Sequence, residues 1–130
     1  MVAEEASFMP AVLVVEANAS HRVLYQMEME ARGFNVVCAR NGHEALEKIQ
    51  QRRFDVAVVE VILPDFKDTE FLKKFSASCQ NLPIIINTSY PYGKSRIRKW
   101  AADAFVTKSS DLNELFGKMN SLARSSRLPR

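Results

Sequence analysis

Four polar side chains that could do chemistry stand at the ends of short apolar runs in this sequence: Glu16, Glu60, Thr88 and Lys108. Two carboxylates and one ammonium group would carry one excess negative charge, and Lys108 could pair with either acid. One such residue alone would be better explained as a solvated acid at a strand end or a β-forming residue at a turn. Four of them in equivalent positions favour one charged site, provided that the fold brings the ends of the runs together.

The apolar runs themselves predict strands. Three of them, residues 12–16, 56–60 and 84–88, are rich in β-branched residues and too apolar for half-exposed strands. We therefore expect central strands that are covered on both faces. Two weaker runs, residues 34–38 and 104–107, complete a set of five. The segments between successive runs have the apolar spacing of helices.

Residues that begin or end helices agree with this alternation. Gly33 stands where a helix would close in a left-handed turn, and Asn41 with Glu44 has the spacing of a capping box. Asp111 with Glu114 repeats that spacing before the last helix. The sequence therefore predicts an α/β fold, a doubly wound five-stranded parallel sheet with helices on both faces. Such sheets bind ligands at the carboxyl ends of their strands, where the four polar residues would meet.

Size and composition indicate one globular domain, with 130 residues of which 47% are apolar. No apolar stretch approaches the ~20 residues that cross a bilayer, and the acidic start does not fit a secretory signal, so we expect a cytoplasmic protein without membrane association. Cys38 and Cys79 lack neighbours at metal-ligand spacing and are expected to be reduced thiols. His21 and His43 have no ligand or nucleophile pattern, and we assign them no chemistry. The net charge of +3 is mild for a nucleic-acid binder.

Taken in order along the chain, these motifs resemble the receiver domain (CheY-like) of two-component response regulators. The resemblance rests on the four strand ends together with Asn-Gly-His-Glu-Ala-Leu at 41–46, Asp-Val-Ala-Val-Val-Glu at 55–60 followed by Pro64, Leu-Pro-Ile-Ile-Ile at 82–86, and Ala-Asp-Ala-Phe at 102–105. It implies a flavodoxin-like fold with strand order 2-1-3-4-5. It also suggests an N-terminal extension at 1–10, a receiver-like domain at 11–123 and a basic tail at 124–130, which we expect to fray.

The resemblance gives each strand-end residue an expected role. In the family, an aspartate at the end of the third strand accepts a phosphoryl group from a histidine kinase, and Glu60 stands at that position. Glu16 matches the first of two acids that help to hold Mg²⁺. Thr88 and Lys108 match the hydroxyl and the amine that contact the phosphate. Phe105 matches an aromatic residue that changes rotamer, although an aromatic residue in a covered strand more often simply packs in the core.

Three positions depart from the family pattern at the chemistry itself. Ala17 stands at the second acidic position, so a carboxylate ligand is missing and Mg²⁺ binding should be weak or absent. Glu60 is one methylene longer than aspartate, which displaces its carboxylate from the position of in-line attack. Ser109 stands where the family has a cis-linked proline, and because a cis Lys108–Ser109 bond would cost about 3 kcal/mol, we expect a trans peptide. We therefore expect no catalytic residue, no metal ligand and no cofactor.

The leading interpretation is a pseudo-receiver, a regulatory module rather than an enzyme, that docks on a protein partner without needing phosphorylation. In this hypothesis Glu60 reaches toward Lys108 and imitates a phosphorylated aspartate. The partner would be a histidine kinase or an output protein, and a homodimer is a further arrangement. Receivers dock through the fourth-helix region, and its basic residues here would suit an acidic surface: Lys94, Arg96, Arg98 and Lys99. Two alternatives stay open, a slow phosphoacceptor that uses Glu60 and, ranked last, a nucleic-acid-associated regulator that uses the basic run.

Overall fold

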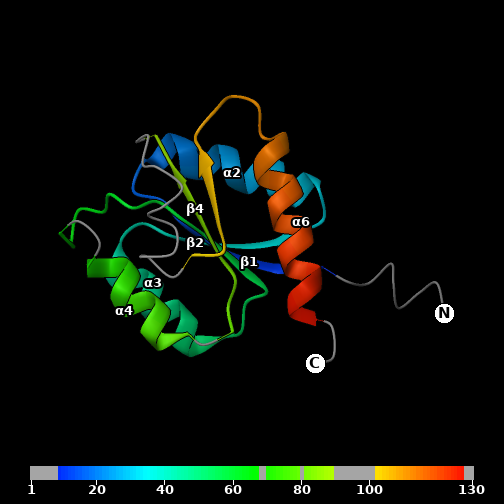
Figure 1. The fold of residues 1–130 in the computed structure, drawn as a ribbon. Coiled ribbons are helices and arrows are strands. Elements are labelled where there is room, and N and C mark those ends of the chain that lie inside the picture. Colours follow the sequence, from blue (N-terminus) through cyan, green and yellow to red (C-terminus); the bar gives the residue numbers. More distant parts are fainter. Residues whose placement is uncertain (1–8, 68–69, 80, 90–101, 128–130) are drawn as a thin grey trace.

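The computed structural model describes residues 9–67, 70–79, 81–89 and 102–127, which form a parallel sheet between two layers of helices (Figure 1). The strands pair in the order β2-β1-β3-β4-β5, and all of these pairings are parallel. This confirms the predicted fold class and strand order. The strands are β1 (Ala11–Val15), β2 (Asn35–Ala39), β3 (Val56–Val59), β4 (Ile84–Thr88) and β5 (Ala104–Thr107).

The helices of the described ranges lie on both faces of the sheet, two on each (Figure 1). α2 and α6 cover one face, and α3 and α4 cover the other. Their bounds are α2 (Ala19–Ala31), α3 (Gly42–Gln51), α4 (Glu70–Ser78) and α6 (Asn113–Arg127). Each helix follows a strand, as parallel pairing requires.

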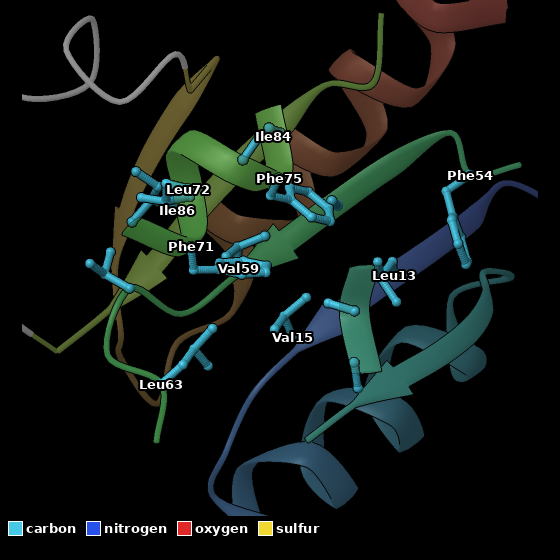
Figure 2. Packing of buried hydrophobic residues seen from close by; sticks show 14 of the residues in the cluster. Leu13, Val15, Phe54, Val59, Leu63, Phe71, Leu72, Phe75, Ile84 and Ile86 are labelled. Atoms are coloured by element: carbon cyan, nitrogen blue, oxygen red, sulfur yellow. The ribbon is translucent and has the colours of Figure 1, made fainter. Parts of the chain in front are cut away.

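Alternation along the central strands divides the core into two clusters. On β1, Leu13 and Val15 belong to the cluster under α3 and α4, whereas Val12 and Val14 belong to the cluster under α2 and α6. Figure 2 shows the first cluster, in which the aromatic side chains of α4 lie over the β-branched residues of the sheet. Because Phe71 is fully buried there, its transfer from water contributes about 1.5–3 kcal/mol to folding.

Several local predictions are confirmed. The Asn41 side chain accepts a hydrogen bond from the Glu44 N–H at 2.8 Å and caps α3. Gly33 has a φ of 89° directly after α2, the left-handed backbone that closes a helix. Every peptide bond in the described ranges is trans, which includes the one between Lys108 and Ser109. Cys38 and Cys79 are free thiols.

The C-terminal end of the chain corrects one prediction. Residues 124–127 do not fray but continue α6 to Arg127. The tail contains no proline before position 129 and no glycine, and arginine is a good helix former, so nothing in the Arg-Ser-Ser-Arg segment at 124–127 stops the helix. At the other end of α6, the Asp111 side chain accepts from the N–H of Asn113, two residues on, so this start differs in spacing from the predicted capping box.

Candidate functional site

The register of the sheet brings two acids to the same height at its carboxyl edge. Val15 on β1 is the register partner of Val59 on β3, so Glu16 and Glu60 both follow directly after the paired ends of neighbouring strands. The N–H of Glu60 donates to the Val15 carbonyl at 2.9 Å, which continues the pairing into the site. Both acids are buried, with exposed fractions of 3% and 7%. Two ionised carboxylates so placed need a positive partner.

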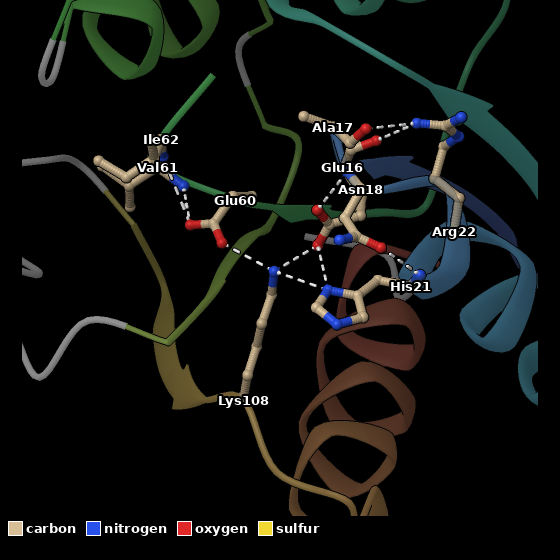
Figure 3. Close-up of polar contacts among 9 residues, drawn as sticks. All are labelled: Glu16, Ala17, Asn18, His21, Arg22, Glu60, Val61, Ile62 and Lys108. Atoms are coloured by element: carbon tan, nitrogen blue, oxygen red, sulfur yellow. Dashed lines mark hydrogen bonds and ion pairs between the residues drawn. The ribbon is translucent and has the colours of Figure 1, made fainter. Parts of the chain in front are cut away.

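Lys108 supplies that partner. It follows β5, and its N–H donates to the Thr88 carbonyl at 2.8 Å, which fixes the backbone from which its side chain reaches across the edge. Its Nζ lies 2.5 Å from Oε1 of Glu16 and 2.8 Å from Oε1 of Glu60 (Figure 3). We call this group of three side chains, Glu16, Glu60 and Lys108, the lysine clamp. One ammonium group is thus shared between the two acids.

Backbone N–H groups hold the second oxygen of each carboxylate. Oε2 of Glu16 accepts from the N–H of Asn18 at 3.0 Å. Oε2 of Glu60 accepts from the N–H of Val61 at 2.7 Å and, at a longer 3.4 Å, from that of Ile62. Hydrogen bonds to a charged acceptor are stronger than those between neutral groups. Each carboxylate is therefore fixed at both oxygens, one by Lys108 and one by the chain that follows the acid.

The clamp also determines the charge state of the amine. Burial of the ammonium by itself lowers the pKa of Lys108, but the hydrogen bonds that it donates to Glu16 and Glu60, and the negative charges of these acids, raise it by more. The pKa of Lys108 therefore lies above its usual value, and the amine stays protonated at neutral pH. Three charges, two negative and one positive, leave a single negative charge in the site.

Thr88 lies at the carboxyl edge of the sheet, whereas Phe105 is inside β5, where it pairs with Ile86, two positions before Thr88 on β4. Thr88 is fully buried at the end of β4. Phe105, on β5, is half-buried and packs against the apolar cluster under α3 and α4. This packing agrees with the expectation that Phe105 fills space, while its role as a rotamer switch, like the phosphate-contact roles of Thr88 and Lys108, stays a prediction. The basic run of Lys94, Arg96, Arg98 and Lys99 lies outside the described residues.

Two residues that sequence reasoning left without chemistry also border the clamp. Nδ1 of His21 lies 3.5 Å from Nζ of Lys108 and 3.8 Å from Oε1 of Glu16 (Figure 3). Arg22 donates from Nη1 to the carbonyls of Glu16 and Ala17, both at 2.9 Å. In the sequence, Asn18 could have indicated these two contacts, because an asparagine at that position can cap a helix that begins directly after β1. In the structure the Asn18 side chain accepts from the N–H of His21, which places the first residues of α2 beside the end of β1.

The donor set does not fit a magnesium ion. Mg²⁺ prefers carboxylate oxygens in octahedral geometry, and the two carboxylates present are both bound to an ammonium group. At position 17 the side chain is a methyl group, which cannot bind a cation. Within the described ranges, no group of three or more histidine, cysteine or acidic side chains could hold a metal ion. Lys108 instead occupies the place between the acids where a cation would neutralise them.

Comparison with known proteins identifies the chain. Residues 12–120 match the family described as response regulator receiver domain. The chain belongs to this family. Among solved structures, the receiver domain is 30% identical to the response regulator TrrA of Thermotoga maritima in complex with Mg²⁺–BeF, with a TM-score of 0.80 over 88% of this chain and 99% of that one. CheY4 of Vibrio cholerae is 26% identical, with a TM-score of 0.79 and the same coverage.

Curated relatives are longer than this chain. The probable transcriptional regulatory protein TcrX of Mycobacterium tuberculosis is 29% identical over 87% of this chain but only 49% of its own length. The transcriptional regulatory protein ZraR of Escherichia coli O157:H7 is 28% identical over 80% of this chain and 24% of its own length. The receiver domain thus spans about a quarter to a half of these relatives. TrrA has also been solved in complex with the histidine kinase ThkA.

Family membership establishes the general function. Receiver domains are the regulatory, non-enzymatic signalling modules of two-component response regulators. No helix in the described part of the chain is long and apolar enough to span a membrane.

Proposed function

We propose that this receiver domain regulates by docking on a protein partner in the cytoplasm and does not need phosphorylation to do so. The observation that carries the proposal is the lysine clamp, in which Nζ of Lys108 contacts Glu16 at 2.5 Å and Glu60 at 2.8 Å. In the family this amine contacts the phosphate, and here it is already bound to two carboxylates. A phosphoryl group would have to displace both of them.

Glu60 is also poorly placed to accept a phosphoryl group. One of its oxygens binds Lys108 and the other accepts from the N–H groups of Val61 and Ile62. Phosphoryl transfer depends on positioning and on neutralising the oxygens of the transferring group, for which the family uses Mg²⁺. With Ala17 in place of an acid, the metal lacks a ligand.

The same contacts support a mimicry of the phosphorylated state. A phosphoaspartate at this position would present its oxygens to the ammonium of Lys108 and to nearby N–H groups, and the longer Glu60 side chain presents a carboxylate to the same types of donor. The clamp would then hold the receiver domain in an arrangement competent for docking. The partner we propose is a histidine kinase or an output protein, by analogy with the TrrA–ThkA complex, and a second copy of the chain is the other candidate.

Intact-mass measurement after incubation with acetyl phosphate tests the first part. We expect no phosphorylation of the wild type with or without Mg²⁺, little for Ala17→Asp or Glu60→Asp alone, and clear phosphorylation of the double variant with Mg²⁺. The gain should exceed the sum of the single variants because the two carboxylates share one ion. Ala17→Asp with Glu60→Asn is the matched control, since it has the new acid but no acceptor. Phosphorylation of Glu60 in the wild type, even at a slow rate, would instead favour the alternative of a slow phosphoacceptor.

Sedimentation velocity tests the mimicry, alone and with a candidate kinase. Glu60→Gln removes the negative charge that pairs with Lys108 and should weaken association, while Glu60→Asp shortens the side chain and should shift the domain toward an inactive arrangement. Association that is unchanged in both variants would leave Glu60 with a structural role only.

A further inference from the structure

A second polar cluster lies away from the clamp, where the loop after β3 meets the start of α3. Asp65, in this loop, accepts from the N–H of Gly42 at 2.9 Å through Oδ1 and from the N–H of His43 at 2.8 Å through Oδ2. Nδ1 of His43 lies 2.5 Å from the same Oδ2. The Asp65 carboxylate therefore binds three groups of α3, although it stands more than twenty positions further along the chain.

Aromatic packing reinforces this contact. The rings of His43 and Phe66 are stacked, with centroids 4.8 Å apart and planes at 27°, and Phe66 in turn meets Phe71 of α4 at 5.6 Å. The approach depends on the glycine at position 42, because a Cβ there would lie 2.5 Å from the Phe66 ring. Asp65 thus binds the start of α3 through hydrogen bonds, and Phe66 packs against the same helix start through its ring.

We propose that Asp65, His43 and Phe66 form a latch that ties the loop after Glu60 to α3 and thereby positions the N–H groups that hold the Glu60 carboxylate. The loop is anchored at one end by β3 and at the other by Asp65, and between them stand Val61 and Ile62, whose N–H groups donate to Glu60. Fixing both ends of so short a segment removes most of its conformational freedom. The latch goes beyond the docking function, since it would position this loop whether or not the site accepts phosphate.

The charges around Asp65 support the assignment. The N-terminus of α3 carries a partial positive charge, which favours a carboxylate. Partial burial raises the pKa of Asp65, but the hydrogen bonds from Gly42 and His43 lower it by more, so the carboxylate is ionised at neutral pH. Glu44, which lies in the first turn of α3, is bound to Arg40 at 3.1 Å and not to the loop that carries Asp65.

Amide hydrogen exchange followed by NMR tests the latch. Asp65→Asn keeps the shape of the side chain but removes its charge and one acceptor, and we expect exchange at the Val61 and Ile62 amides to accelerate about tenfold or more. Glu44→Gln is the matched control, because the Glu44 side chain is similarly exposed, at 25% against 21% for Asp65, and lies at the same helix start. In this control, exchange at Val61 and Ile62 should not change.

Two further measurements separate positioning from general loosening. Exchange at Leu13 and Ile86, in the core strands, should stay slow in Asp65→Asn, and the pKa of Lys108 should fall toward its usual value as Glu60 loses its fixed position. His43→Phe, which keeps an aromatic ring on Phe66 but removes Nδ1, should accelerate Val61 and Ile62 in the same direction by a smaller factor. If Asp65→Asn fails to fold, the exchange rates of Val61 and Ile62 in His43→Phe test the latch in its place. Unchanged exchange at Val61 and Ile62 in the folded variants, with faster exchange only in α3, would overturn the latch and leave Asp65 as a helix cap.

Discussion

The two edges of the parallel sheet use acidic side chains in opposite ways. At the amino edge, Oδ2 of Asp55 accepts from the N–H of Ala11 at 2.7 Å, and the N–H of Asp55 donates to the carbonyl of Ala11 at 2.8 Å. Asp103 repeats this exchange with Ile84, both contacts at 2.8 Å. At the carboxyl edge, Glu16 and Glu60 converge on the ammonium of Lys108.

The difference lies in what each acid needs from the rest of the chain. An amino-edge aspartate binds the first N–H of a neighbouring strand, so its contact is complete once two strands have paired. The two carboxyl-edge acids lie beside each other and depend on one shared cation from a third strand end. The amino edge therefore contributes separable stability, whereas the carboxyl edge is a coupled unit whose parts cannot be removed one at a time without leaving a buried charge.

The largest expected effect comes from removing the cation. Lys108→Met should lower the free energy of unfolding by about 3–5 kcal/mol, because it leaves two buried carboxylates without a counter-charge. Urea denaturation at pH 7 measures the loss. Lys118→Met, at an exposed position of α6, is the control and should change stability by less than about 0.5 kcal/mol. A loss below about 1 kcal/mol for Lys108→Met would show that the two carboxylates are not coupled through the amine.

Raising the pH should remove part of the same stabilisation. The pKa of Lys108 is raised in the folded state, so its contribution is fully present below the ordinary lysine pKa of about 10.4 and is lost as pH rises through the higher folded value. The loss should be smaller than that of Lys108→Met, because a neutral amine still donates hydrogen bonds. Denaturation curves between pH 9 and 11.5 measure it. Lys108→Arg, which stays charged in this range, should show a shallower decline.

At the amino edge we expect a smaller and separable loss. Asp55→Ala should lower the free energy of unfolding by about 1–3 kcal/mol, because it leaves the N–H of Ala11 without its acceptor in a buried position. The pKa of Lys108, followed by NMR, should be unchanged in this variant. A shift of that pKa would mean that the two edges are coupled after all.

Asp103→Ala should have the smallest effect of the four. The Asp103 side chain is exposed, so water can replace it as the acceptor for the Ile84 N–H, and we expect a loss of less than about 1 kcal/mol. Thermal unfolding of Asp55→Ala, Asp103→Ala and the double variant gives the comparison. The two losses should add, since β1 and β4 do not share an amino-edge contact.

Much of this arrangement could be predicted from the order of residue types alone. Apolar runs rich in valine and isoleucine identified the central strands, and because parallel strands end at one edge, Glu16, Glu60 and Lys108 were expected to meet there. The position of Gly33 after α2 was equally readable, since few other residues adopt its backbone conformation. In these cases the period of the pattern or the type of one residue decides the structure locally.

The contacts of His21 and Asp65 could not be predicted in the same way. His21 meets Lys108 only because the Lys108 side chain reaches from the end of β5 to the first turn of α2, and no spacing in the sequence encodes that approach. Asp65 binds α3 from a loop without periodicity, and a single aspartate after a proline has many possible uses. The extent of α6 beyond residue 123 was also misjudged, because a basic run near a chain end resembles a solvated tail until it is seen to continue a helix.

The separation of the clamp residues along the chain has a consequence for how the receiver domain folds. Glu16 follows the first strand, Glu60 the central one and Lys108 the last, so the three side chains can meet only after β5 has joined the sheet. Closing so long a loop is entropically costly, and such contacts form late. Until then, two neighbouring acids repel each other at the edge of a partly assembled sheet. Arrival of Lys108 ends that repulsion, so the clamp favours the complete domain over every shorter intermediate.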